Sequence, residues 1–243
     1  DVVAVVTAPD KPSGRGQQLQ SSAVKICALK HQLPILQPTN LKDPQFLKDL
    51  KDFKADLQIV VAFRMLPKVV WEMPSLGTFN LHASLLPNYR GAAPINWAII
   101  NGETKTGVTT FFIDDKIDTG AMILNAETPI SKTESAGELH DRLMQLGSET
   151  VIQTLALLEK GNVTTTIQQD TADIKTAYKL NKENCKIDWT QPGNTIFNLI
   201  RGLSPFPGAL TKLDDKIFKI FVLFFILSTK SFALVSVDIT RGN

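Results

Sequence analysis

Short apolar runs alternate with segments of helical pattern through the first half of the chain, and this alternation constrains the fold most. Three pairs of an apolar run and a helical pattern follow one another, at residues 2–7 and 21–31, 57–62 and 67–72, and 78–82 and 93–101. Strands that alternate with helices are typical of α/β proteins. We therefore predict an α/β fold with a largely parallel sheet flanked by helices.

The middle of the chain carries signals for a strand pair and a long helix. Residues 108–113 and 121–127 predict two strands joined around the turn Asp118-Thr119-Gly120. Ser135 and Glu138 form the pattern of a capping box, and Gly161 supplies a stop signal. A long helix is therefore expected between them.

Composition excludes several classes of protein. The chain has 243 residues, of which 43% are hydrophobic and 21% charged, as in folded globular proteins. A net charge of +2 neither demands nor forbids a nucleic-acid partner, so any RNA contact must be local. Cys27 and Cys185 lie far apart without metal-ligand spacing, which predicts no metal site, no disulfide and a cytoplasmic location. The longest apolar run, residues 220–227, is too short to span a membrane.

Polarity along the chain predicts the domain organisation. We expect a main domain at residues 1–163, a polar linker at 164–186 and a small strand-rich domain at 187–243. The sequence begins with Asp1 followed at once by a strand-like run, so we expect that a first strand and helix of the natural protein are missing.

Asn80 and His82 are the first candidate functional residues. They are two residues apart in a predicted strand, so their side chains face the same side about 6.6 Å apart. Ligands of open α/β sheets bind at the carboxyl ends of the strands. An amide and an imidazole there can polarise a carbonyl and move a proton, as acyl transfer requires. A single strand histidine is more often a structural residue, so the pair alone leaves both roles open.

Asp118 is the third candidate. We predict that Asp114 and Asp115 lie in a solvent-exposed turn and form hydrogen bonds with the backbone of that turn. Asp118 differs because the small pair Thr119-Gly120 lets the backbone approach another element. Beside His82, its negative charge would favour the charged form of the imidazole.

The string from Asn80 to Pro94, with Ser84-Leu85-Leu86-Pro87 and Tyr89-Arg90-Gly91 inside it and Asp118-Thr119-Gly120 downstream, resembles the formyltransferase family that uses 10-formyltetrahydrofolate. The likeness runs over about residues 2–208 and implies a Rossmann-like catalytic domain. It implies catalytic roles for three residues, Asn80, His82 and Asp118. It also implies folate contacts, from Ser84, Leu85, Leu86 and Pro87 and, in the loop at residues 62–67, from Phe63, Met65 and Leu66.

Two further segments resemble the branch of the family that formylates methionyl initiator tRNA in translation initiation. The loop at residues 7–18 resembles an insertion that recognises tRNA, which implies tRNA contacts from Lys11 and Arg15. Residues 186–189 and 204–209 resemble the entrance to an OB-like tRNA-binding barrel, expected to be incomplete in residues 187–243. The resemblance implies 10-formyltetrahydrofolate as co-substrate, no metal, no membrane and a monomer.

Alternatives from other classes stay open at this point. The chain would instead formylate a small amine, such as glycinamide ribonucleotide or an aminosugar nucleotide, or would bind folate or RNA without catalysis. The loop at residues 7–18 favours the tRNA substrate over a small amine. Intact Asn80, His82 and Asp118 favour an enzyme over a binding module.

Overall fold

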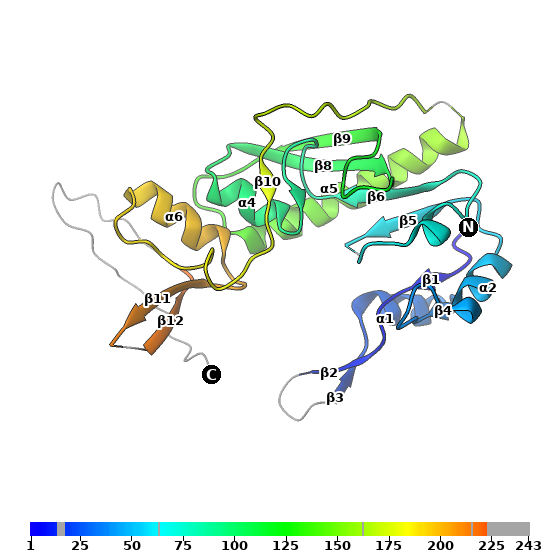
Figure 1. Ribbon diagram of the computed structural model, residues 1–243, viewed down its shortest axis with the longest axis horizontal. Helices are drawn as coiled ribbons and strands as arrows, with labels where there is room; N and C mark the ends of the chain where they lie inside the picture. Colours follow the sequence, from blue (N-terminus) through cyan, green and yellow to red (C-terminus); the bar gives the residue numbers. More distant parts are fainter. Residues whose placement is uncertain (14–17, 63, 162, 215, 223–243) are drawn as a thin grey trace. The chain divides into compact units, whose positions relative to one another are not determined.

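The computed structural model describes residues 1–13, 18–62, 64–161, 163–214 and 216–222 (Figure 1). The chain divides into two compact units, Asp1–Phe79 and Asn80–Asn243. No helix among the described residues is long and apolar enough to cross a membrane. The predicted division at residues 163 and 186 stays a prediction.

The first unit contains short strands and three helices, in the order β1 (Val5–Val6), β2 (Lys11–Ser13), β3 (Gln18–Gln20), α1 (Ala23–Lys30), β4 (Ile35–Leu36), α2 (Pro44–Asp52), β5 (Gln58–Val61) and α3 (Lys68–Trp71). β1 pairs with β4 in parallel, as expected for a strand, a helix and a second strand in α/β order. β2 and β3 pair in an antiparallel ribbon. β5 lies beside the start of the next strand, β6 (Thr78–His82).

Helix α2, which the sequence analysis did not predict, is well defined by its local sequence. Asp43 caps it by accepting a hydrogen bond from the Phe46 amide at 2.9 Å, and Pro44 occupies the first turn. Phe46 and Leu50 are four residues apart and both are buried, so one face of the helix packs into the core of this unit.

The second unit is built around β6, β8 (Lys105–Phe112) and β9 (Met122–Pro129), which are neighbours in that order. Its other elements are β7 (Arg90–Gly91), α4 (Pro94–Ile100), α5 (Ala136–Glu159), β10 (Thr176–Ala177), α6 (Gly193–Gly202), β11 (Ala209–Leu213) and β12 (Lys216–Ile220). β8 and β9 are antiparallel, whereas β7 and β10 are parallel. The α/β class is thus confirmed. The four-stranded sheet β5-β6-β8-β9 contains an antiparallel pair, because the connection after β8 returns the chain alongside it, so the sheet is not as uniformly parallel as predicted.

The long helix α5 packs against β8 and β9 (Figure 1). Its capping box is formed as predicted, because the Ser135 hydroxyl accepts from the Glu138 amide while the Glu138 carboxylate accepts from the Ser135 amide. Leu139 and Leu143 are buried on the side that faces the core. β8 is buried along most of its length, so this helix and the sheet share one apolar core.

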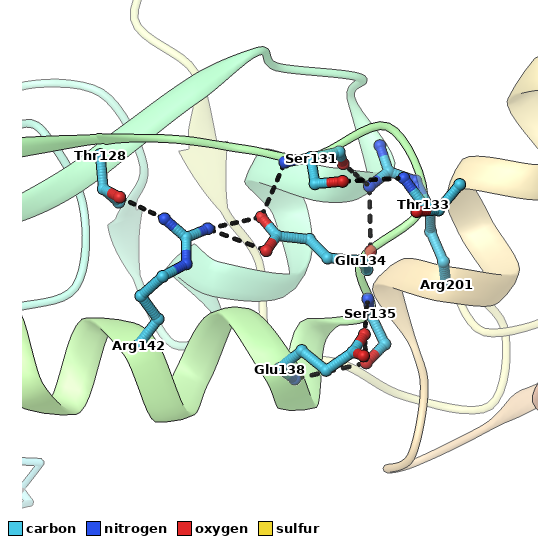
Figure 2. A network of polar contacts seen from close by, with 8 residues as sticks. All are labelled: Thr128, Ser131, Thr133, Glu134, Ser135, Glu138, Arg142 and Arg201. Carbon is cyan, nitrogen blue, oxygen red and sulfur yellow. Dashed lines mark hydrogen bonds and ion pairs between the residues drawn. The ribbon is translucent and has the colours of Figure 1, made fainter.

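Figure 2 shows a polar network where β9 leads into α5. Arg142 of α5 donates to both carboxylate oxygens of Glu134, at 2.6 and 2.8 Å, and also to Thr128 of β9. Arg201 of α6 donates to the backbone carbonyls of Ser131 and Glu134 at 3.2 and 3.0 Å. The network therefore ties three elements, β9, α5 and α6, to one connecting segment.

The end of the described chain forms a second small core. Helix α6 and the antiparallel pair β11 and β12 contribute buried apolar side chains to it, with others from the preceding segment: Cys185, Ile187, Ile196, Ile200, Leu203, Ala209 and Ile220. Residue Lys186 also forms a parallel bridge with Leu210. The predicted strands beyond residue 222 lie outside the described residues.

Candidate active site

His82 ends strand β6 and its ring is held by a backbone group. Only 7% of the residue is exposed, and its Nε2 lies 2.8 Å from the carbonyl oxygen of Tyr89. A carbonyl oxygen only accepts hydrogen bonds, so Nε2 carries a hydrogen. Phe111 packs edge-on to the ring. The remaining nitrogen, Nδ1, is therefore the one that faces the other polar groups of the site.

Asp118 lies beside His82, as the sequence analysis expected. Its Oδ2 is 3.7 Å from Nδ1 of His82, a distance too long for a hydrogen bond but short enough for electrostatic attraction. The same Oδ2 accepts a hydrogen bond from the Gly91 amide at 2.9 Å. The carboxylate is thus held by a backbone amide and lies next to the imidazole.

Asn80 contributes an unfilled hydrogen-bonding position. Its Oδ1 is the buried side-chain nitrogen or oxygen that has no hydrogen-bond partner among the described residues. An unpaired buried polar atom costs about 1–3 kcal/mol, so such atoms are rare unless a ligand completes them. Asn80 precedes His82 by two residues in the same strand, which turns both side chains to the same side. The site is therefore suited to a polar substrate.

The turn that carries Asp118 depends on a close backbone approach. Asp118 has φ of 55°, in the left-handed region that aspartate tolerates. A Cβ on Gly120 would lie 1.7 Å from the Phe112 carbonyl oxygen, which confirms that the small residue lets two backbone segments meet. Asp114 accepts hydrogen bonds from the Lys116 amide and the Thr119 hydroxyl, as expected of an aspartate that caps its own turn.

Gly91 is a residue of the site that the sequence analysis quoted without giving it a role. Its φ of 118° is unfavourable for other residues, and a Cβ there would lie 2.5 Å from the Ala177 carbonyl oxygen. The amide of Gly91 is the donor that holds Asp118. Only a glycine therefore presents this donor while strand β7 lies so close to β10.

The predicted folate segment at Ser84, Leu85, Leu86 and Pro87 is ordered by its own hydrogen bonds. The buried hydroxyl of Ser84 donates to the Asn88 carbonyl at 2.7 Å. Thr109 of β8 donates from its hydroxyl to the Ser84 carbonyl at 2.7 Å and accepts from the Leu86 amide at 3.2 Å. The Ser84 hydroxyl is therefore already used within the protein, and folate binding by this segment stays a prediction.

The other predicted contacts belong to the first unit. Met65 and Leu66 line a hollow of about 710 Å³, and Met65 is 68% exposed. Lys11 is exposed on β2. Phe63 and Arg15 lie outside the described residues. Folate contacts from the loop and tRNA contacts from the ribbon stay predictions.

Sequence reasoning missed a buried glutamine in the predicted linker. Gln168 is 8% exposed, and its side-chain amide donates to the backbone carbonyls of Asp118 and Gly120. The surrounding polar sequence has no periodicity, so no local signal distinguishes this residue from its neighbours.

Two further features bear on what the site binds. No group of three or more His, Cys, Asp or Glu side chains within the described ranges is placed to hold a metal ion. A cavity of about 880 Å³ lies at the start of α5 and the end of α6, and Asn80, His82 and Asp118 are not among the residues that line it.

Comparison with known proteins assigns the family. The family model described as formyl transferase matches residues 1–155, and the one described as formyl transferase, C-terminal domain, matches residues 179–231. Two proteins named methionyl-tRNA formyltransferase, from Flavobacterium johnsoniae and Flavobacterium psychrophilum, are 75% and 68% identical to the chain. The matches cover 89% and 88% of this chain and 69% and 68% of those proteins.

A solved structure shares the fold at low sequence identity. HypX from Aquifex aeolicus, in complex with tetrahydrofolic acid, matches with a TM-score of 0.64 and 22% identity over 80% of this chain and 34% of that one. The first family model covers more than half of the sequence, and both Flavobacterium relatives are far above 30% identity. The chain belongs to the formyltransferase family.

Proposed function

We propose that the protein transfers the formyl group of 10-formyltetrahydrofolate to the α-amino group of methionine on initiator tRNA. The observation that carries the proposal is the pairing of His82 with Asp118, 3.7 Å apart, in a chain 75% identical to a protein named methionyl-tRNA formyltransferase. In this reaction the bond from folate N10 to the formyl carbon breaks and a bond from that carbon to the methionine nitrogen forms. The amine loses a proton and N10 gains one.

Three side chains of the second unit would serve this chemistry. Asn80 donates from its amide to the formyl oxygen, where negative charge develops. Nε2 of His82 donates a hydrogen bond to the Tyr89 carbonyl oxygen. The other ring nitrogen, Nδ1, is therefore the one that would interact with the reacting groups. Asp118 stabilises positive charge on that ring and helps to move the proton from the amine towards N10.

Folate and tRNA would be bound by the segments that the family likeness indicated. Ser84 to Pro87 presents backbone groups held in place by Thr109. Met65 and Leu66, the other proposed folate contacts, line a hollow of the first unit. The positively charged side chains of Lys11 and Arg15 would bind tRNA phosphates electrostatically. The antiparallel pair β11 and β12 is compatible with the OB-like tRNA-binding barrel expected in the C-terminal domain. We further expect a cytoplasmic monomer.

A substrate comparison tests the function. The protein is incubated with 10-formyltetrahydrofolate and, separately, with methionyl initiator tRNA, glycinamide ribonucleotide or an aminosugar nucleotide. Formylmethionyl-tRNA is expected as the product, with tetrahydrofolate released in equal amount, and Asp118→Asn should form it far more slowly. Preferred formylation of a small amine would replace the proposed substrate, and folate binding without any product would identify a binding module.

A further inference from the structure

The segment that follows α5 contains one buried side chain in an exposed stretch. Residues 164–167 and 169–173 are exposed, whereas Gln168 is 8% exposed. The sequence predicts this stretch as a linker, and a linker has no need to bury an uncharged polar side chain. The contacts of Gln168 therefore call for an explanation of their own.

Gln168 uses both ends of its side-chain amide. Nε2 donates to the carbonyl oxygens of Asp118 and Gly120 at 2.9 and 2.8 Å, and Oε1 accepts from Nε of Arg90 at 2.9 Å. Two carbonyl oxygens need a donor and the guanidinium needs an acceptor, so only one orientation of the amide fits. The donor and acceptor groups of the Gln168 amide are thus complementary to the polar groups around it.

These contacts hold the two segments that meet at the catalytic carboxylate. Asp118 and Gly120 are fixed through their backbone, in a turn where Asp118 has φ of 55°. Arg90 immediately precedes Gly91, whose amide binds the Asp118 carboxylate. One amide therefore sets the spacing between the carboxylate and the donor that orients it.

The same stretch of chain also holds the backbone that orients His82. The Tyr89 amide donates to the Lys175 carbonyl at 2.5 Å, and the Ala92 amide donates to the Ala177 carbonyl at 2.8 Å. Tyr89 is the residue whose carbonyl oxygen lies 2.8 Å from Nε2 of His82. Both members of the catalytic pair are thus positioned by contacts with residues 168–177.

From this arrangement we infer that Gln168 is a positioning residue for the Asp118 and His82 pair. The inference rests on the proposed function, because it concerns the rate of that reaction. Gln168 does not touch the reacting groups. It keeps the carboxylate next to the imidazole, and its loss lets the Asp118 turn move while the substrate-binding segments stay in place.

Kinetics of Gln168→Ala and Gln168→Glu test the inference, with Gln169→Ala as the matched control on the exposed neighbour. Gln168→Ala removes all three hydrogen bonds. Gln168→Glu keeps the acceptor for Arg90 but places a carboxylate oxygen against two carbonyls. Both variants should lower kcat by about tenfold or more, since a displacement of about 1 Å in an active site costs up to about a hundredfold. KM for methionyl-tRNA and folate affinity should stay close to those of the wild type. Tm should fall by a few degrees because buried polar groups lose their partners, while both variants stay folded at the assay temperature. Gln169→Ala should behave as the wild type.

The outcomes separate the two proposals. A wild-type protein that forms no formylmethionyl-tRNA contradicts the proposed function and the inference with it. An active wild type together with Gln168 variants within about twofold of its kcat overturns the inference alone. Equal losses in kcat and in folate affinity, or unfolding of both variants, would show a structural role and also overturn it.

Discussion

At the scale of single residues, Asn80 carries a buried polar atom that lowers the stability of the fold. Its Oδ1 is buried without a partner, whereas Ser84 and Thr109 nearby use their hydroxyls within the protein. An unpaired buried oxygen lowers the free energy of unfolding by about 1–3 kcal/mol. The unpaired Oδ1 in β6, two residues before His82, is an acceptor that a hydrogen-bond donor of a bound substrate would satisfy.

Replacement of Asn80 should separate activity from stability. If Asn80 donates to the developing oxyanion as proposed, Asn80→Ala should lower kcat by roughly a hundredfold or more. It also removes the unpaired oxygen, so the free energy of unfolding in urea should stay the same or rise by about 1 kcal/mol. Asn125→Ala, at an exposed position of β9, is the control. Activity within a few-fold of the wild type would exclude Asn80 from catalysis.

Sequence reasoning reached some of these residues and not others for a physical reason. Strand alternation is local, so it placed Asn80 and His82 on one side of β6. The contact from His82 to Asp118 joins two separate segments, and only the family resemblance indicated it before the structure did. Gln168 is 50 residues from Asp118 in a stretch without periodicity, and neither kind of reasoning found it.

At the scale of elements, a network of hydrogen bonds joins the connection between β9 and α5 to helix α6 (Figure 2). Glu134 accepts from Arg142 and from the Ser131 amide, while Arg201 reaches the same connection from α6. Burial lowers the pKa of Arg201, and the nearby charge of Glu134 opposes that effect. The capping box at Ser135 was predictable from local sequence, whereas the contact from α6, about 70 residues away, was not.

Arg201→Met should destabilise the connection between β9 and α5 and lower the free energy of unfolding. Methionine keeps much of the apolar volume but leaves the carbonyls of Ser131 and Glu134 without their donor. Because hydrogen bonds to a charged group contribute about 1.5–3 kcal/mol, the free energy of unfolding should fall by about 2 kcal/mol. Urea unfolding measures it, with Lys132→Met at an exposed position of the same connection as control. Equal effects of the two substitutions would show that the Arg201 contacts contribute nothing specific.

The stability of the molecule as a whole should depend on pH through Glu103. Burial by itself raises the pKa of this carboxyl, but hydrogen bonds from Lys175 and Tyr89 outweigh it and the pKa lies below the ordinary 4.5. Burial and the same contact with Glu103 raise the pKa of the Tyr89 hydroxyl, which remains a donor at neutral pH. A carboxyl with a lowered pKa stabilises the fold above its unfolded pKa and loses that contribution as pH falls through the folded value.

Glu103→Gln tests this dependence. The variant keeps an acceptor for Tyr89 and removes the charge that faces Lys175. The difference in free energy of unfolding between wild type and variant should be largest near neutral pH and should shrink as pH falls below about 4.5. Urea unfolding at a series of pH values measures it. A difference that stays constant down to acid pH would show that the ionised carboxylate does not contribute.

The close contact of β7 with β10 determines where the chain can be truncated without disturbing the candidate site. Residues 168–177 lie on the far side of the sequence boundary at residue 163, yet Ala177 meets Gly91 and Gln168 meets Asp118. A truncation at that boundary would remove groups that hold Gly91 and Asp118 in place, while leaving Asn80, His82 and Asp118 in the remaining chain. A fragment meant to keep this candidate site intact should therefore extend at least through Ala177.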